Sequence, residues 1–231
     1  NLKNTKFYSR QYIDKDDIKS VVKCLKSNFL TTGPLNKLFE KKVRNFCQSK
    51  FCILVNSGTS ALIASLHSIN LKKNDIVLVP AISFVATANC ASLLGLKVKF
   101  IDVDAKTGLI NPETLKKALK KNKAKAIINV HLNGNIGDLR PIFKICKKKN
   151  IKIIEDACHA FGTEIKNGKK FYRIGSNKYS DITTFSFHPV KTITTGEGGA
   201  ILTNNKKYYD YIKKYINHGM FPKPLEEKKY S

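Results

Sequence analysis

Apolar and helix-like segments alternate along most of this chain. From about residue 50 onward, short apolar runs read as strands at residues 51–55, 75–79, 97–103, 126–130, 151–155, 182–185 and 200–203. Between them, three segments read as helices, at residues 59–69, 112–121 and 138–149. These helices begin at Thr59, Asn111 and Asp138, residue types suited to a helix N-terminus. Such alternation indicates an α/β fold, with a mostly parallel sheet covered by helices on both faces.

The first 45 residues follow a different pattern. Residues 14–27 and 36–46 are amphipathic helical segments, and the turn-forming residues 30–34 join them. We expect residues 1–45 to form a helical lead-in packed on a main domain that covers residues 46–219.

The end of the chain reads as a helix followed by a connection. Residues 206–217 form the last helical pattern, before Gly219 and two prolines. The sequence opens without a methionine and stops after a charged stretch, so we expect a fragment. Residues 220–231 would then begin a connection to a further domain.

The chain is strongly basic, with 42 lysines and arginines against 17 acids and a formal net charge of +25. Such a charge is typical of proteins that bind nucleic acid or another polyanion. The excess is nearly all lysine, however, because the arginines are only Arg10, Arg44, Arg140 and Arg173. Arginine is preferred for bidentate phosphate and base contacts, so a solvated lysine surface is the preferred interpretation.

Cysteine usage and hydropathy indicate the compartment. The six cysteines, at positions 24, 47, 52, 90, 146 and 158, form no C-x-x-C pair and mostly fall inside apolar runs. This usage predicts a reducing environment and no metal site. No apolar stretch approaches the roughly 20 residues that a membrane span needs, and no signal-peptide pattern is present. We therefore expect a soluble cytoplasmic protein.

The first candidate site follows the first predicted strand. Residues 56–62, with the sequence NSGTSAL, form a small-residue turn that opens a helix. Free N–H groups and the positive dipole end of a helix can bind a phosphate there, with the hydroxyl groups of Ser57, Thr59 and Ser60 as further donors. Serine and threonine also cap helices for structural reasons alone, so this segment by itself leaves both interpretations open.

The second candidate site is an apolar strand that ends in two acids. Residues 151–159 have the sequence IKIIEDACH, which places Asp156 at the carboxyl end of a strand, where ligands bind in open α/β sheets. A carboxylate there can pair with the pyridinium nitrogen of a cofactor, or it can cap the next turn. His159 could hydrogen-bond the phenolic oxygen of such a cofactor, or fill a polar pocket.

The third candidate site surrounds one lysine. In residues 186–199, with the sequence SFHPVKTITTGEGG, Lys191 lies between a proline turn and a glycine-rich loop in a mostly uncharged setting. Desolvation or a nearby cation makes such an amine nucleophilic toward an aldehyde. Any single lysine in this chain is nevertheless more often a solvated charge.

The three segments, together with Phe84 in the sequence PAISFVATAN at residues 80–89, resemble the sugar aminotransferases of the DegT/DnrJ/EryC1/StrS family. The similarity runs from residue 30 to residue 220. The family belongs to the fold-type I enzymes that use pyridoxal 5'-phosphate (PLP). The resemblance therefore implies the aspartate aminotransferase-like large domain, with a mostly parallel, mixed sheet, and the family's C-terminal small domain is expected to be absent here.

The resemblance implies a role for each candidate residue. Lys191 would hold PLP as a Schiff base and move protons, and Asp156 would pair with the pyridine nitrogen. Phe84 would stack on the ring, and His159 would lie against the ring oxygen. The residues that would hold the phosphate are Gly58, Thr59 and Ser186.

The resemblance also implies a reaction. The family's similar sugar dehydratases have a histidine at the position of Lys191, so transamination is preferred over deoxygenation. Glutamate would be the donor, and the 4-keto group of a nucleotide-linked 6-deoxyhexose the acceptor, in surface-polysaccharide or nonulosonic acid synthesis. Residues 82–89, 186–188 and 191–195 are most similar to the branch that makes the amino sugar for pseudaminic acid.

Two other functional classes stay open. One is a lysine-rich nucleic-acid-binding protein, and the other is an inactive family fragment that acts as an interaction module. The family's C-terminal domain carries an H-N-x-R segment that reaches a neighbouring subunit's site, and a homodimer is implied only by the resemblance.

Overall fold

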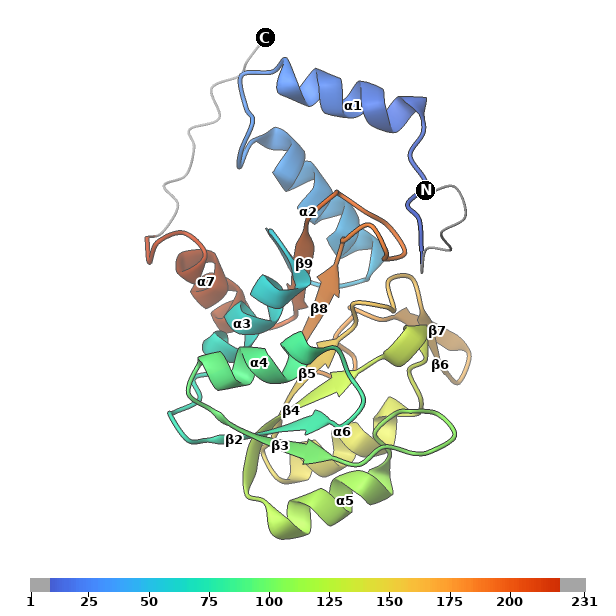
Figure 1. Ribbon diagram of the computed structural model, residues 1–231, viewed down its shortest axis with the longest axis vertical. Coiled ribbons are helices and arrows are strands. Elements are labelled where there is room, and N and C mark those ends of the chain that lie inside the picture. The colour runs from blue at the N-terminus through green and yellow to red at the C-terminus, as the bar shows by residue number, and fades with distance from the viewer. Residues whose placement is uncertain (1–8, 221–231) are drawn as a thin grey trace, which may run out of the picture.

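The computed structural model describes residues 9–220, which form a seven-stranded sheet in the order β1-β9-β8-β5-β4-β2-β3 (Figure 1). Its strands are β1 (Phe51–Val55), β2 (Ile76–Pro80), β3 (Lys97–Ile101), β4 (Ala124–Val130), β5 (Lys152–Asp156), β8 (Ile182–Ser186) and β9 (Gly199–Thr203). β9 is antiparallel to both β1 and β8, and the pairs from β8 to β3 are parallel. All strands except β9 therefore point the same way, and their carboxyl ends share one edge of the sheet.

Helices cover both faces of this sheet, as the sequence predicts. On one face lie α3 (Gly58–Ser68), α4 (Val85–Leu93) and α7 (Lys206–Tyr215). On the other lie α2 (Pro34–Phe46), α5 (Pro112–Lys121) and α6 (Leu139–Lys148). Side chains alternate along each strand, so Val77 and Val79 face the first layer and Leu78 the second. Burial on both faces explains why the strands read as continuous apolar runs.

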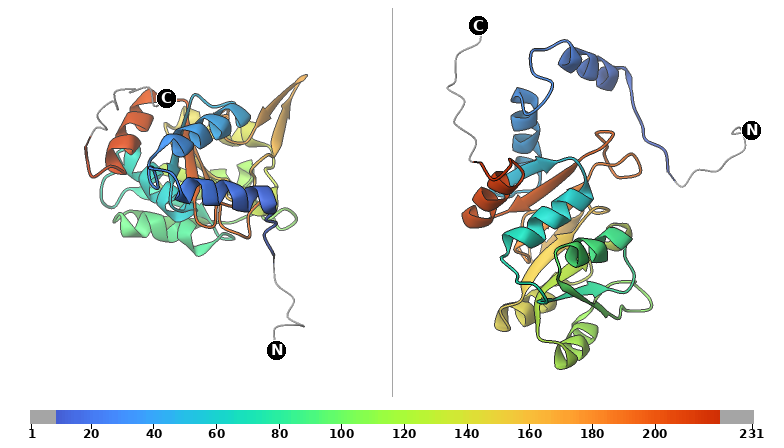
Figure 2. Two further views of the ribbon diagram at one scale, coloured as in Figure 1. Left: turned by 90° about the horizontal axis from the view of Figure 1, so that it is seen from above. Right: turned by 60° about the vertical axis from the view of Figure 1, so that its left-hand side comes forward.

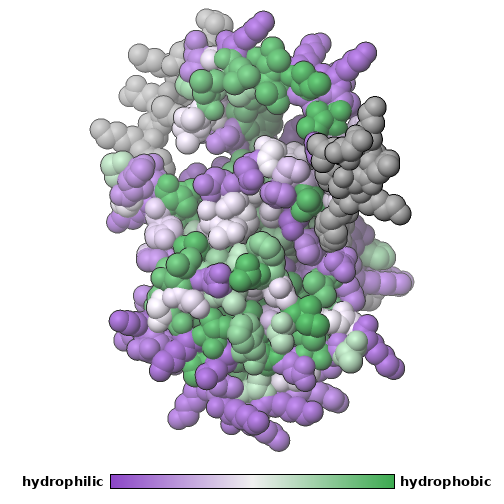
Figure 3. Space-filling view, in the orientation of Figure 1, coloured by the Kyte–Doolittle hydropathy of each residue, from purple (hydrophilic) through white to green (hydrophobic). Residues whose placement is uncertain are grey.

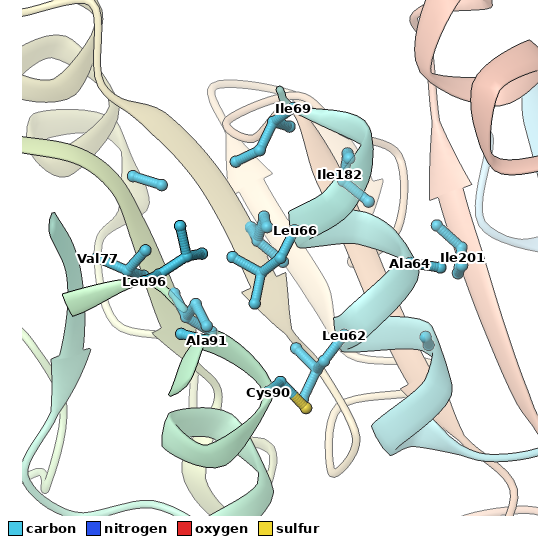
Figure 4. Close-up of a cluster of buried hydrophobic side chains, with 14 of the residues drawn as sticks. Leu62, Ala64, Leu66, Ile69, Val77, Cys90, Ala91, Leu96, Ile182 and Ile201 are labelled. Atoms are coloured by element: carbon cyan, nitrogen blue, oxygen red, sulfur yellow. The ribbon is translucent and has the colours of Figure 1, made fainter. Parts of the chain in front are cut away.

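The helix α3 is fixed by the core on the first face (Figure 4). Leu62 and Leu66 point from α3 toward Cys90 and Ala91 of α4, and all four are buried. Full burial of one leucine side chain stabilises a fold by about 1.5–3 kcal/mol. This packing holds the N-terminus of α3 at the carboxyl edge of the sheet.

Helix starts agree with the sequence in two cases and differ in one. Asn111 caps α5 and Asp138 caps α6, each through a side-chain oxygen that accepts backbone N–H bonds. The cap of α3, however, is Ser57 and not Thr59. Ser57 has the extended backbone that a cap requires (φ −164°, ψ 163°), whereas Thr59 already lies inside the first turn.

The N-terminal segment does not pack as one unit. α2 begins at Pro34, places Val43 in the core and lies against β1. α1 (Lys15–Leu25) has no buried residue and stands away from the sheet (Figures 1 and 2). A capping box between Asp14 and Asp17 closes the start of α1. The expected packing of the whole lead-in on the main domain is therefore not seen for α1.

Four described elements were not predicted: α4, the two strands of a hairpin, β6 (Glu164–Asn167) and β7 (Lys170–Arg173), and the short 3₁₀ helix η2 (Leu132–Gly134). Among residues 9–220, no helix has both the length and the apolar character that a membrane crossing demands. Apart from Met220, the predicted connection at residues 220–231 lies outside the described residues.

Candidate functional site

A cavity of about 350 Å³ lies at the edge where the parallel strands end. The segments that line it follow the carboxyl ends of β1, β2, β4, β5 and β8. This is the usual place for a ligand in an open α/β sheet. The residues to which the family resemblance assigns a role all line this cavity: Gly58, Thr59, Phe84, Asp156, His159, Ser186 and Lys191. Of the two other serines offered as phosphate donors, Ser57 lines it and Ser60 does not.

The N-terminus of α3 faces the cavity with unused donors. Ser57 Oγ accepts the Ser60 N–H at 3.1 Å, and Ser60 Oγ donates to Asn56 Oδ1 at 2.6 Å. The hydroxyl groups of Ser57 and Ser60 are thus engaged within the turn, although the sequence offered both as phosphate donors. The N–H groups of Gly58 and Thr59 make no hydrogen bond within residues 9–220. They lie at the N-terminus of α3, which is the positive end of the helix dipole.

Gly58 allows a close approach between α3 and two strand ends. A Cβ at this position would lie 2.9 Å from Ser186 Cβ and 3.0 Å from Cys158 Sγ. Both distances are shorter than ordinary contacts between side chains. The missing side chain therefore brings the α3 N–H groups and the Ser186 hydroxyl to one side of the cavity, where together they can bind an anion.

Asp156 is a buried carboxylate, only 6% exposed, whose oxygens accept hydrogen bonds from the protein. Thr87 Oγ1 donates to Asp156 Oδ2 at 2.8 Å, and the Cys158 N–H donates to Asp156 Oδ1 at 3.3 Å. Thr87 is fully buried in α4 and in turn accepts from Ser83 Oγ at 2.6 Å. Each carboxylate oxygen retains further lone pairs for a ligand in the cavity.

The loop that carries Lys191 is closed by backbone hydrogen bonds. The Phe187 N–H donates to Gly198 O at 2.9 Å, and the Thr195 N–H donates to Phe187 O at 3.0 Å. Within the loop, the Lys191 N–H donates to His188 O at 2.9 Å. Lys191 is half-buried and lines the same cavity as Asp156. The structure thus brings a lysine amine and a buried acid to one site.

Charge and burial alter two neighbours of these residues. Burial raises the pKa of the Cys158 thiol well above its usual value, and the negative charge of Asp156 adds to the effect. Burial also lowers the pKa of His159, and the positive charge of Lys191 lowers it further, against an opposing contribution from Asp156. At neutral pH the thiol is therefore protonated and the imidazole is neutral.

Phe84 presents an exposed ring at the cavity. It lies directly before α4 in an extended conformation and is 71% exposed. Within the described part of the chain, its ring stacks on no other aromatic side chain. A large apolar ring that the core does not use is free to pack on a flat ligand.

A buried pair beside Asp156 was not anticipated from the sequence. His131 follows β4, lines the cavity, and has its Nε2 3.5 Å from Glu155 Oε1. Glu155 Oε2 accepts from Ser180 Oγ at 3.0 Å and from Thr183 Oγ1. Burial favours a higher pKa for Glu155, but His131 and these hydroxyl groups outweigh it, so the pKa is lowered. A histidine just after a predicted strand was the signal that could have identified this residue.

The lining residues fit PLP. The buried Asp156 matches a pyridine nitrogen, the exposed Phe84 matches a flat ring, and Lys191 supplies an amine for an aldehyde. The open N–H groups of α3 beside Ser186 match a phosphate. Across residues 9–220, no group of three or more histidine, cysteine or acidic side chains is arranged to hold a metal ion.

The sequence matches a known enzyme family along nearly its whole length. The profile of the DegT/DnrJ/EryC1/StrS aminotransferase family matches residues 11–231. A UDP-4-amino-4,6-dideoxy-N-acetyl-beta-L-altrosamine transaminase of Campylobacter jejuni strain 81-176 is 41% identical over 220 residues, covering 94% of this chain and 56% of that protein. The transaminase of the same name from Helicobacter pylori is 34% identical, covering 95% and 57%. The chain therefore spans about half the length of the curated relatives it matches.

Solved structures show the same fold. A Helicobacter pylori aminotransferase involved in the biosynthesis of pseudoaminic acid superposes with a TM-score of 0.86 at 32% identity, covering 96% of this chain and 58% of that one. A putative sugar aminotransferase from Streptococcus pneumoniae, in its PLP form, gives a TM-score of 0.84 at 27% identity, covering 94% and 59%. The predicted fold class, an α/β large domain with a mixed sheet, is confirmed.

Proposed function

Because the chain belongs to the DegT/DnrJ/EryC1/StrS aminotransferase family, we propose that it carries the cofactor-binding domain of a PLP-dependent nucleotide-sugar aminotransferase. The observation that carries this proposal is the convergence of Lys191, Asp156, Phe84 and the α3 N-terminus on one cavity. Each of the four matches a different part of PLP. A domain that had lost its function would have no reason to keep all four together.

Bound PLP would supply an electron-withdrawing ring that stabilises negative charge on the carbon next to the transferred nitrogen. Lys191 Nζ would attach the cofactor and, once released, would accept and return a proton. Asp156 would keep the pyridine nitrogen protonated, with Thr87 and the Cys158 N–H fixing its carboxylate. Phe84 would cover one face of the ring and exclude water from it.

The donor is proposed from the family resemblance, and the acceptor from the names of the relatives. We assign glutamate as the amino donor and the 4-keto group of a nucleotide-linked 6-deoxyhexose as the acceptor. The support for the acceptor is the sequence identity to transaminases named for UDP-4-amino-4,6-dideoxy-N-acetyl-beta-L-altrosamine. A coupled assay with UDP-linked and dTDP-linked 4-keto sugars, read by mass spectrometry, identifies the acceptor from the mass of the aminated product.

The first experiment is an absorbance spectrum of the purified protein with PLP, before and after addition of glutamate. We expect a visible band from covalently bound cofactor, and glutamate should convert it to a band at shorter wavelength. Lys191→Ala should lack the band, whereas Lys207→Ala, which removes an exposed lysine of α7, should keep it. A wild-type protein without any such band contradicts the proposal.

A second variant separates binding from chemistry. Asp156→Asn should still bind PLP, because the phosphate contacts and Lys191 are intact. It should slow the glutamate-dependent spectral change by roughly 10²-fold or more, since a neutral amide cannot hold the charge of the pyridinium. Asp102→Asn, which neutralises an exposed carboxylate just beyond β3, is the matched control and should react at the wild-type rate.

We further propose a homodimer. Support comes from the family and from the uncovered apolar side chains of α1, which gather at the top of Figure 3: Ile18, Val21, Val22 and Leu25. Multi-angle light scattering should give twice the chain mass of 26.0 kDa. A mass equal to that of one chain at micromolar concentration contradicts the homodimer.

A further inference from the structure

The short helix η2 lies against the segment that carries His159. The backbone N–H of Asn133 donates to His159 Nδ1 at 3.3 Å. Gly134, the next residue, has a φ of +80°, and a Cβ there would lie 3.0 Å from the carbonyl oxygen of His159. The two segments are therefore in close backbone contact beside the cavity.

Asn133 has an unusual backbone for a residue with a side chain. Its φ of 52° and ψ of 26° are left-handed, a conformation that asparagine tolerates better than most residues. Its side chain is exposed and makes no hydrogen bond within residues 9–220. The contribution of this position to the site is thus its backbone N–H and not its side chain.

The turn is held at both ends. Before Asn133, the His131 N–H donates to the carbonyl oxygen of Asp156 at 3.1 Å. After it, Thr163 Oγ1 donates to Gly134 O at 3.4 Å. The N–H of Asn133 is therefore placed by the same strand ends that place Asp156 and His159.

We infer that the backbone of Asn133 is a positioning group that sets the tautomer of His159. A backbone N–H can only donate, so Nδ1 must be the bare acceptor nitrogen and Nε2 must carry the proton of the neutral ring. This inference rests on the proposed function for its purpose. The ring then offers the cavity an N–H donor, which suits an anionic oxygen on the cofactor ring.

The surrounding charges support a neutral ring. Burial opposes a second proton on His159 and the charge of Lys191 adds to this effect, whereas Asp156 favours a second proton, and the balance lowers the pKa of His159. A second proton on Nδ1 would also face the Asn133 N–H, which places two donors against each other. Protonation of His159 must therefore break the contact with η2.

The test is ¹⁵N NMR of the imidazole nitrogens in the protein without PLP. His159→Gln assigns the signals by loss, since the chain has five histidines. We expect a single neutral tautomer, with Nδ1 bare and Nε2 protonated. A variant protein in which an ester oxygen replaces the backbone N–H of Asn133 should contain a mixture of both neutral tautomers of His159. It should also raise the pKa of His159 by about 0.5–1 unit, because a neutral hydrogen bond to the unprotonated ring is lost.

Two side-chain variants complete the design. Asn133→Gly keeps both the N–H and the left-handed backbone, so it should retain the wild-type tautomer. Asn133→Val disfavours a positive φ and should shift the tautomer in the same direction as the ester. A wild-type ring with its proton on Nδ1, or an ester variant with unchanged ring signals, overturns the inference. These signals need no cofactor, so a failure here is distinct from a missing PLP band.

Discussion

The carboxylate of Asp156 is held by a hydroxyl group that no sequence motif assigns to it. Thr87 lies in α4, far from Asp156 in sequence, and its Oγ1 donates to Asp156 Oδ2 at 2.8 Å. Ser83 Oγ donates to Thr87 Oγ1 at 2.6 Å, so the hydroxyl proton of Thr87 is available for the bond to the carboxylate. The orientation of the acid toward the cavity therefore depends on α4 as much as on β5.

Removal of this hydroxyl group should be costly. Thr87→Val keeps the shape of the buried side chain but leaves Asp156 Oδ2 with one donor fewer. We expect the free energy of unfolding to fall by about 1–3 kcal/mol, because a buried charged acceptor loses its partner. Thr87→Ser keeps the hydroxyl group and should lose less. Urea denaturation of the three proteins measures the difference, and equal midpoints for valine and wild type would falsify it.

The pH response of His159 gives a second prediction. Lys191→Ala removes a positive charge that lowers the pKa of His159, so that pKa should rise and can be measured by NMR titration. As pH falls below the usual histidine value of 6.5, the unfolded chain takes up a proton more readily than the folded one. The free energy of unfolding should therefore decrease as the pH is lowered through this range, and it should decrease less steeply in Lys191→Ala. Lys207→Ala should behave as the wild type does.

The sequence was informative for site residues that follow strand ends. Gly58, Asp156, Ser186 and Lys191 lie in short segments whose composition is unusual, so each could be identified locally, and the structure places them at one cavity. Their proposed roles stay predictions. His131 carried such a local signal too, because it directly follows a predicted strand, but its pairing with Glu155 was not anticipated. Thr87 and Asn133 could not be found in this way, because their contacts depend on which strands and helices become neighbours in space.

At the scale of elements, apolar strands and helices with a clear start signal or an apolar face were predicted, whereas α4 and the β6–β7 hairpin were not. α5 shows an amphipathic pattern with a proline at its start, and its predicted bounds agree with the structure. α4 carries apolar residues on exposed and buried sides alike, such as Leu93 and Cys90, so no helical period is visible. The β6–β7 hairpin was missed although Asn167-Gly168 is a strong turn signal, because its strands are short and partly exposed.

The junction between α3 and β8 should be sensitive to one methyl group. Gly58→Ala would bring a Cβ to 2.9 Å from Ser186 Cβ, so α3 must move away from the strand end. We expect stability to fall by about 1–3 kcal/mol, as in other overpacked cores, and PLP to bind more weakly because the N–H groups of α3 move with the helix. A PLP titration of a folded Gly58→Ala protein checks this, and wild-type affinity would argue against a phosphate at this helix.

For the whole molecule, the charge of +25 is spread over many lysines. Hydrophilic side chains surround most of the outline in Figure 3 and do not gather in one patch on that face. Within residues 9–220, the ion pairs include Lys206 with Asp210 and Lys213 with Glu40, and most of the lysines in that range form no ion pair with an acid. A protein with such a dispersed positive charge attracts anions over a wide area of its surface. It lacks the arginine-rich surface that is typical of specific nucleic-acid recognition.

This charge predicts a weak attraction to any polyanion that salt abolishes. Binding to a random DNA duplex should be detectable at about 50 mM salt and lost by about 200 mM, because it depends on counterion release. PLP binding should persist across that range, since it relies on Lys191 and on donors in a partly enclosed cavity. Lys191→Ala should abolish cofactor binding and leave DNA binding unchanged. Tight DNA binding that survives 200 mM salt would instead favour the nucleic-acid interpretation, because surface lysines alone cannot provide it.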